Sequence, residues 1–213
     1  MGNLLTIGVL VSGNGTNLQS IIDRCNDGSL TARIGCVISN NADAFALERA
    51  RKHGIPTIHL NHREFSGREA YDATLIKVLR DHGVDLVILA GFMRIITPVL
   101  IDAFPNAIMN IHPALLPAFP GLHAQRQALE YGVKISGCTV HFVDAGTDTG
   151  PIIMQAAVAV DTDDTEESLS ARIQLEEHRI FPLAIQLYAA GRLTVEGRRV
   201  VVSSPPVAAQ KPR

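Results

Sequence analysis

The stretch LLTIGVLVSGNGTNLQSIIDRC, residues 4–25, decides the fold of this chain. It begins with a near-continuous apolar run, Leu4 to Val11, which is typical of a strand buried on both faces of a sheet. A turn rich in serine, glycine and asparagine follows at residues 12–17. Apolar residues then recur at helical spacing, at Leu18, Ile21, Ile22 and Cys25. The stretch therefore predicts a strand, a tight turn and a helix.

The same alternation continues along the first half of the chain. Strand-like apolar runs occur at 33–39, 55–60 and 84–91, and helix-like segments at 42–54 and 68–83. Strands that alternate with helices predict an α/β fold, a Rossmann-like, doubly wound and mostly parallel sheet with helices on both faces. The run VDLVILAG, at 84–91, is the most apolar of the strands and is expected near the centre of the sheet.

The alternation of strands and helices ends after AIMNIH, at 107–112. Two strands, at 136–143 and 151–160, bracket the loop DAGTDTG and predict antiparallel strands toward the C-terminal part. A long helix is expected over 164–191, with a break possible near Pro182. Its apolar stripe comprises Leu169, Ile173, Ile180, Leu183 and Leu187. A small hairpin is expected at 192–202. We expect one domain over 1–202 and a disordered tail over 203–213.

Composition narrows the class of protein. With 213 residues the chain is long enough for one well-packed domain. A formal net charge of −2 gives no reason to expect a nucleic acid or an anionic membrane as a partner. The N-terminus carries no secretion signal and no membrane span. The cysteines, Cys25, Cys36 and Cys138, are widely spaced and odd in number, which predicts reduced thiols in a cytoplasmic protein.

The turn SGNGTN, at 12–17, predicts an anion site. Backbone N–H groups at the start of a helix attract phosphate, and the glycines allow close approach. The dinucleotide fingerprint needs a third glycine, but Leu18 stands there, and the turn has no lysine for a nucleoside triphosphate. A single phosphate monoester therefore fits best. The alternative is a plain turn in which Thr16 or Asn17 caps the helix.

A second candidate site lies at MNIHPALLPAFPG, residues 109–121. Asn110 and His112 come at the end of a predicted strand and point the same way, because strand side chains repeat every two residues. Prolines stiffen the loop that follows, and Asp148 lies in the glycine-flanked loop 144–150. An amide that donates to an oxyanion, a histidine that moves a proton and a carboxylate that tunes it suit acyl or formyl transfer.

Other kinds of catalysis fit the sequence less well. No serine or cysteine lies in a G-x-S-x-G elbow, so a covalent acyl-enzyme is not indicated. His112, His123 and His141 lack the spacing of a metal site, and we expect no metal.

At these residues the chain resembles the folate-dependent formyltransferase family. The segments NIHPALLPAFPG, TVHFVD and DTGPIIMQ carry the likeness, which runs from about residue 4 to 195. The segments SGNGTN and FPGLHAQRQALE resemble the branch that formylates glycinamide ribonucleotide in purine synthesis. The resemblance implies 10-formyltetrahydrofolate as co-substrate, glycinamide ribonucleotide as acceptor, and a monomer or homodimer.

The resemblance also implies roles for individual residues. The implied catalytic residues are Asn110, His112 and Asp148. The implied substrate-binding residues are Gly15, Thr16, Asn17 and Glu177. The implied folate-binding residues are Arg68, Met93, Arg94, Ile95, Ile96, Asn110, Asp144, Ala145, Gly146, Thr147 and Asp148. Without it, Glu177 would be read as a solvated helix face, Met93 to Ile96 as core and Arg68 as surface.

Three alternatives remain. A methionyl-tRNA formyltransferase would be expected to carry a basic C-terminal domain. A formyltetrahydrofolate hydrolase would use a similar site with water as acceptor and would be expected to carry an N-terminal regulatory domain. A non-catalytic phosphate-binding module would explain the turn at 12–17 but not the trio Asn110, His112 and Asp148.

Overall fold

The fold is built on a single sheet of mixed direction. The structure is a computed structural model that describes residues 4–204. Its strands are β1 Leu5–Val11, β2 Ala32–Ser39, β3 Thr57–His59, β4 Leu86–Leu89, β5 Ile108–His112, β6 Ile135–Phe142, β7 Ile152–Ala159, β8 Leu193–Glu196 and β9 Arg199–Val202. In the described chain these strands lie in the order β3-β2-β1-β4-β5-β6-β7-β9-β8.

The strand directions confirm the predicted fold class. The first five strands pair in parallel, whereas β5, β6 and β7 pair antiparallel. The predicted hairpin β8–β9 forms and extends the sheet through a parallel pairing of Ile152 with Arg199. Of the predicted tail 203–213, only Ser203 and Ser204 are described, and 205–213 lie outside the described residues.

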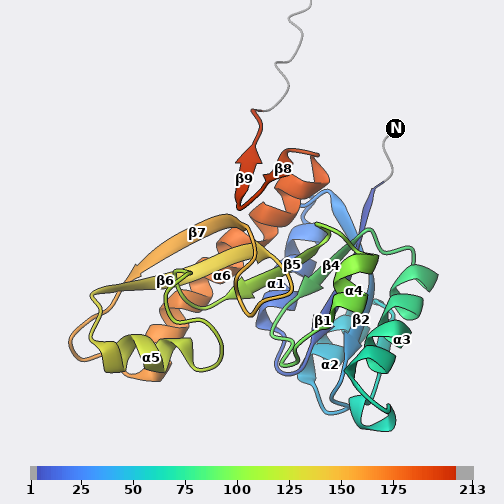
Figure 1. Cartoon of the computed structure of the whole chain (residues 1–213), viewed down its shortest axis with the longest axis horizontal. Helices are drawn as coiled ribbons and strands as arrows, with labels where there is room; N and C mark the ends of the chain where they lie inside the picture. Colours follow the sequence, from blue (N-terminus) through green and yellow to red (C-terminus); the bar gives the residue numbers. More distant parts are fainter. Residues whose placement is uncertain (1–3, 205–213) are drawn as a thin grey trace, which may run out of the picture.

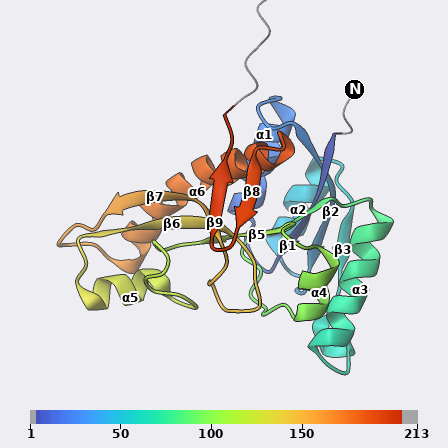
Figure 2. The same ribbon diagram turned by 45° about the horizontal axis from the view of Figure 1, so that its top comes forward.

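Helices cover both faces of the sheet. They are α1 Thr16–Asn26, α2 Phe45–Lys52, α3 Arg68–Asp81, α4 Pro98–Ala103, α5 Ala124–Tyr131 and α6 Glu166–Ala189, with a short 3₁₀ turn at His62–Glu64. Helix α6 packs on α1 and on strands β6 and β7, while α3 packs on α4. Figure 1 shows the order of the elements, and Figure 2 shows α1 and α6 on one side of the sheet and α3 and α4 on the other. The short helices α4 and α5, of six and eight residues, were not expected from the sequence.

Helix α6 corrects two details of the sequence interpretation. The helix runs through Pro182 without a break, and Pro182 is itself buried. Packing of the neighbouring Phe181 and Ile185 against the sheet holds the helix together at the missing hydrogen bond. The predicted stripe was wrong at Leu183, which is 46% exposed, because the buried face instead follows Ile180, Phe181 and Ala184.

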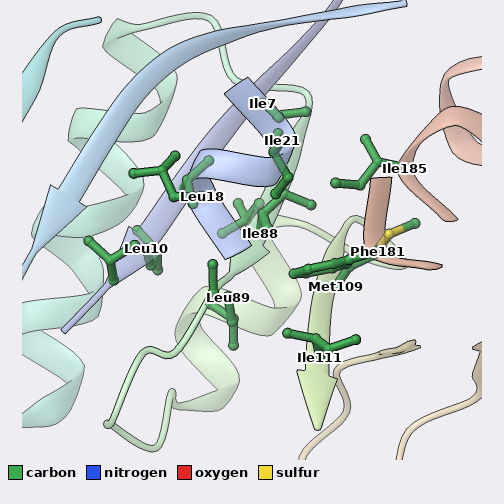
Figure 3. Packing of buried hydrophobic residues seen from close by; sticks show 14 of the residues in the cluster. Ile7, Leu10, Leu18, Ile21, Ile88, Leu89, Met109, Ile111, Phe181 and Ile185 are labelled. Atoms are coloured by element: carbon green, nitrogen blue, oxygen red, sulfur yellow. The ribbon is translucent and has the colours of Figure 1, made fainter. Parts of the chain in front are cut away.

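The core lies between the central strands and the helices α1 and α6. Leu18 and Ile21 of α1 and Phe181 of α6 are fully buried and point toward the apolar side chains of β1, β4 and β5 (Figure 3). Burying each such side chain contributes about 1.5–3 kcal/mol to stability. The apolar periodicity of α1 therefore fixes which face of the helix meets the sheet, and hence where its N-terminus lies.

The strand order creates a crevice at the carboxyl ends of β1, β4 and β5. From β1 the chain moves outward to β2 and β3, and it then returns to the other side of β1 to form β4 and β5. Ligands of open α/β sheets bind at such a switch point. The loop after β1, the loop after β4 and the proline loop after β5 all begin at this edge. Both candidate sites of the sequence therefore lie in one place.

Candidate active site

Asn110, His112 and Asp148 converge at this edge of the sheet. His112 Nδ1 lies 3.3 Å from Asp148 Oδ2, and Asn110 Nδ2 lies 3.5 Å from Asp148 Oδ1. His112 is 4% exposed, and Asn110 lies on the same strand, β5, two residues before it. The strand repeat predicted that Asn110 and His112 point the same way, and the structure brings Asp148, 36 or more residues away in sequence, beside both.

The loop between β6 and β7 presents Asp148. Its backbone is left-handed at Asp148, with φ of 54°, a conformation that aspartate tolerates better than most residues. The N–H of Gly121 donates to Asp148 Oδ2 at 2.7 Å. At Gly150 a β-carbon would meet the carbonyl oxygen of Phe142 at 1.7 Å, so only glycine allows the loop to close here. The carboxylate is thus fixed by backbone contacts on both sides of the cleft.

The proline loop holds the other side of the His112 ring. His112 Nε2 lies 2.8 Å from the carbonyl oxygen of Phe119, so Nε2 carries the proton and donates. The loop is tied to β6 by the buried Thr139, whose hydroxyl donates to Ala114 O at 2.7 Å and accepts from Leu116 N at 3.0 Å. The loop is therefore rigid, as its prolines predicted, and hydrogen bonds to neighbouring backbone groups add to that rigidity.

The charge of the His112 ring depends on its burial and on its neighbours. Burial lowers the pKa of His112 and outweighs the Phe119 carbonyl and the Asp148 carboxylate, which raise it. Burial alone would raise the pKa of Asp148, but the hydrogen bond from the Gly121 N–H and the nearby imidazoles together lower it. At neutral pH Asp148 is therefore ionised while His112 is largely neutral.

The contacts of His112 nevertheless suit a proton acceptor. Both ring nitrogens face oxygen atoms that can only accept, namely Phe119 O and ionised Asp148 Oδ2. A neutral ring leaves the Nδ1 lone pair against a carboxylate, whereas a protonated ring satisfies both oxygens. The site is therefore built to take up one proton when a reaction supplies it.

We expect Asp148→Asn to lower the pKa of His112 further. The carboxylate is one of the groups that raise this pKa, and the amide removes its charge while keeping its size. The measurement is an NMR titration of the His112 imidazole in both proteins. An unchanged or higher pKa in Asp148→Asn would show that Asp148 is not coupled to the ring.

His141 also belongs to the cluster, although from the sequence it was considered only as a metal ligand and rejected. It pairs with Asn110 across β5 and β6, and its Nε2 lies 3.2 Å from Asn110 Nδ2 and 3.7 Å from Asp148 Oδ1. Its Nδ1 lies 2.8 Å from the carbonyl oxygen of Phe142. That bond places the proton on Nδ1, so Nε2 accepts from the Asn110 amide and orients it. The antiparallel pairing of TVHFVD with MNIH was the signal that could have revealed this neighbour.

A cavity of about 590 Å³ opens beside the cluster. Its wall includes the predicted folate-binding residues Met93, Arg94, Ile95, Ile96, Asn110, Asp144, Gly146, Thr147 and Asp148. Met93 and Ile95 are 69% and 64% exposed, so their interpretation as core residues was wrong. Two predicted residues, Arg68 and Ala145, are not part of the wall. Arg68 is exposed at the start of α3.

The turn after β1 forms a second, smaller hollow of about 250 Å³, lined by residues 12–17. Gly91 and Met93 line both hollows, so the two are adjoining. Gly15 adopts φ of 73°, and a β-carbon there would lie 2.5 Å from the β-carbon of Ala46. Only glycine fits, and it brings the first N–H groups of α1 to the hollow. An anion bound in this hollow would therefore lie close to the cluster of Asn110, His112 and Asp148.

The polar side chains of Thr16 and Asn17 do not cap α1. The N-cap is Gly15, without a side-chain hydrogen bond, so the alternative of a plain capped turn is wrong. Thr16 Oγ1 accepts from Gln174 Nε2 at 2.9 Å, and Asn17 Nδ2 donates to Glu177 Oε2 at 2.9 Å. These bonds join the turn to α6.

Glu177 is buried, contrary to its interpretation as a solvated helix residue. It is 8% exposed, and burial raises its pKa, opposed by the hydrogen bond from Asn17. A buried carboxyl group with one protein partner is costly, which marks it as a candidate for binding a ligand's hydroxyl or amine.

Neither a metal-binding cluster nor a membrane-spanning helix is found in the described part of the chain. Within residues 4–204, no group of three or more His, Cys, Asp and Glu side chains could hold a metal ion. No helix in that part of the chain has the length and apolar character needed to cross a membrane.

Comparison with known proteins identifies the family. Residues 5–185 match the family described as "Formyl transferase". The chain is 49% identical over 189 residues to the phosphoribosylglycinamide formyltransferase of Escherichia coli (strain K12), covering 89% of each chain. It is 46% identical over 185 residues to the trifunctional purine biosynthetic protein adenosine-3 of Homo sapiens, which covers 87% of this chain and 18% of the human protein.

A solved structure agrees with these matches. Glycinamide ribonucleotide transformylase 1 from Symbiobacterium toebii has a TM-score of 0.95 and 57% identity, with 96% of each chain covered. The sequence match over most of the chain and the shared fold show that this chain belongs to the formyl transferase family.

Proposed function

We propose that the chain transfers the formyl group of 10-formyltetrahydrofolate to the primary amine of glycinamide ribonucleotide. The observation that carries the proposal is the junction of two hollows, one at the turn of residues 12–17 and the other beside Asn110, His112 and Asp148. A phosphorylated acceptor in the first and a folate in the second would meet at the cluster. The relatives named for this reaction support the choice of substrates.

The reaction begins when the amine attacks the formyl carbon, and the carbonyl oxygen becomes an alkoxide. Asn110 Nδ2, oriented by His141, donates to that oxygen. The amine loses a proton to the His112–Asp148 pair, whose protonated form satisfies all of its contacts. The cationic ring stabilises the alkoxide. The proton then moves to the folate nitrogen as its bond to carbon breaks, which releases tetrahydrofolate and the formylated acceptor.

A single assay separates the proposal from its rivals. Purified protein receives 10-formyltetrahydrofolate with and without glycinamide ribonucleotide, and tetrahydrofolate is measured. Release only with the ribonucleotide is the expected result. Release without it would identify a hydrolase, and no release in either case would favour a binding module.

We expect Glu177→Gln to raise the KM for the ribonucleotide about tenfold, because a charge-assisted hydrogen bond is worth roughly 1.5–3 kcal/mol. The KM for the folate should stay close to normal, since Glu177 lines neither hollow and is bonded to the turn 12–17 through Asn17. Steady-state kinetics with each substrate varied in turn provides the measurement.

Glu176→Gln is the matched control for this change. Glu176 is the preceding residue of α6 and pairs with Arg179 near the surface, so its change should leave both KM values unaltered. If Glu177→Gln raised both KM values equally, a role in binding the ribonucleotide would be excluded.

The cellular compartment is also a proposal. Cys25, Cys36 and Cys138 are free thiols, which persist in reducing compartments. We therefore place the reaction in the cytoplasm.

A further inference from the structure

A buried carboxylate that the proposed mechanism does not use lies beneath the loop after β4. Asp72, in α3, is 2% exposed, and its Oδ2 accepts from the N–H of Thr97 at 2.6 Å. Thr97 ends the loop and is the N-cap of α4. This bond joins α3 to a loop that begins at the carboxyl end of β4.

The loop is held at three points. At its start, the N–H of Met93 donates to Ser12 Oγ at 2.9 Å. In its middle, the guanidinium of Arg94 lies over the ring of Tyr71, 5.3 Å from the centroid. At its end is the bond from Thr97 to Asp72. Between these points the apolar side chains of Met93 and Ile95 are exposed in the cavity wall.

Burying the polar groups that hold this loop carries a cost in folding free energy. Tyr71 and Thr97 are buried, and their hydroxyls have no hydrogen-bond partner within residues 4–204. Burial raises the pKa of Asp72, and the bond from Thr97 and the nearby guanidiniums of Arg94 and Arg68 oppose that rise. Apolar residues could have joined α3 to α4 without burying a carboxylate, so its presence points to a role beyond packing.

We propose that Asp72 is a positioning residue for the folate site: it fixes the loop 93–97 so that Met93, Arg94 and Ile95 form a preorganised wall. It acts through Thr97 and through the charge it presents to Arg94, and it does not itself line the cavity. This inference rests on the proposed function, because it names the folate as the ligand of that wall.

Asp72→Asn tests the inference. The amide keeps the shape and can still accept from Thr97, but it loses the charge, which roughly halves the strength of the bond. We expect the KM for 10-formyltetrahydrofolate to rise about tenfold, because a loop left mobile must be ordered on binding. The kcat and the KM for the ribonucleotide should stay within about threefold of the original values, since Asp72 contacts neither the cluster nor the turn 12–17, and Met93, which lines both hollows, keeps its bond to Ser12.

A second readout does not depend on catalysis. Hydrogen exchange at the amide of Thr97 should be faster in Asp72→Asn, and the change should be confined to the loop 93–97. If the original protein showed no formyl transfer, the proposed function would fail. Unchanged exchange at Thr97 would overturn the inference whether or not transfer occurs.

Two further variants complete the test. Asp85→Asn is a matched control, because Asp85 also accepts from a backbone N–H, that of Thr6 at 2.9 Å, but at the opposite end of the strands. It should leave all kinetic constants unchanged.

Arg94→Gln combined with Asp72→Asn should raise the folate KM by less than the product of the single effects, because both act on one loop. Equal increases in both KM values, or full additivity, would show that Asp72 is only structural.

Discussion

Changing Asp148 to Asn should lower kcat about 10²–10⁴-fold, the range expected for loss of a proton-transfer group. The carboxylate contacts His112 and Asn110 and is the partner that lets His112 accept the amine proton. An amide has nearly the same size and can still accept from Gly121, so both substrates should bind with nearly normal affinity. The measurement is kcat from initial rates, together with substrate affinities from calorimetry.

Asp81→Asn is the control for this experiment. Asp81 pairs with Lys77 on the surface of α3, and exposed pairs of this kind contribute little. Its activity should match the original protein. If Asp148→Asn kept a near-normal rate, Asp148 would have no part in the chemistry.

The second large effect is expected for Asn110→Ala. Removing one donor to a developing oxyanion typically lowers kcat about 10²–10³-fold. KM values should change much less, because the bond to the alkoxide forms only in the transition state. Single-turnover rates with saturating substrates would isolate the chemical step.

The double variant refines this prediction. Asn110 and Asp148 are in contact, and residues that act as a unit give non-additive losses. Asn110→Ala with Asp148→Asn should therefore be little slower than the slower single variant. Asn26→Ala, at the exposed end of α1, is the control and should have no effect. A loss in KM alone for Asn110→Ala would assign the amide to binding instead of catalysis.

The sequence predicted most of the fold because period and composition act locally. The apolar run at Leu5–Val11 reflects a strand buried within the sheet. The helical spacing of Leu18 and Ile21 reflects a helix whose apolar face packs against that sheet. Asn110 and His112 could be paired because alternate residues of a strand point the same way. The convergence of Asp148 on that pair was expected from its glycine-flanked acidic loop and from the resemblance, not from strand spacing.

The remaining features depend on contacts between distant segments. His141 enters the cluster only through the register of β5 with β6, which period alone does not give. The burial of Glu177 depends on α6 packing over the turn at Asn17, 160 residues away in sequence. The lowered pKa of His112 reflects burial of the ring, which outweighs the neighbouring carboxylate and depends on contacts that the sequence does not show.

The central claim is that Asn110 and the His112–Asp148 pair surround the oxygen of the transferred formyl group. The most direct test is a crystal structure with glycinamide ribonucleotide and a folate analogue whose formyl group is replaced by a non-transferable aldehyde, which water converts to a tetrahedral diol. One diol oxygen should lie within about 3 Å of Asn110 Nδ2, and the other should face the His112–Asp148 pair. The phosphate of the ribonucleotide should lie on the backbone N–H groups of Gly15 to Asn17. A diol that points away from Asn110, or a phosphate bound elsewhere, would contradict the central claim.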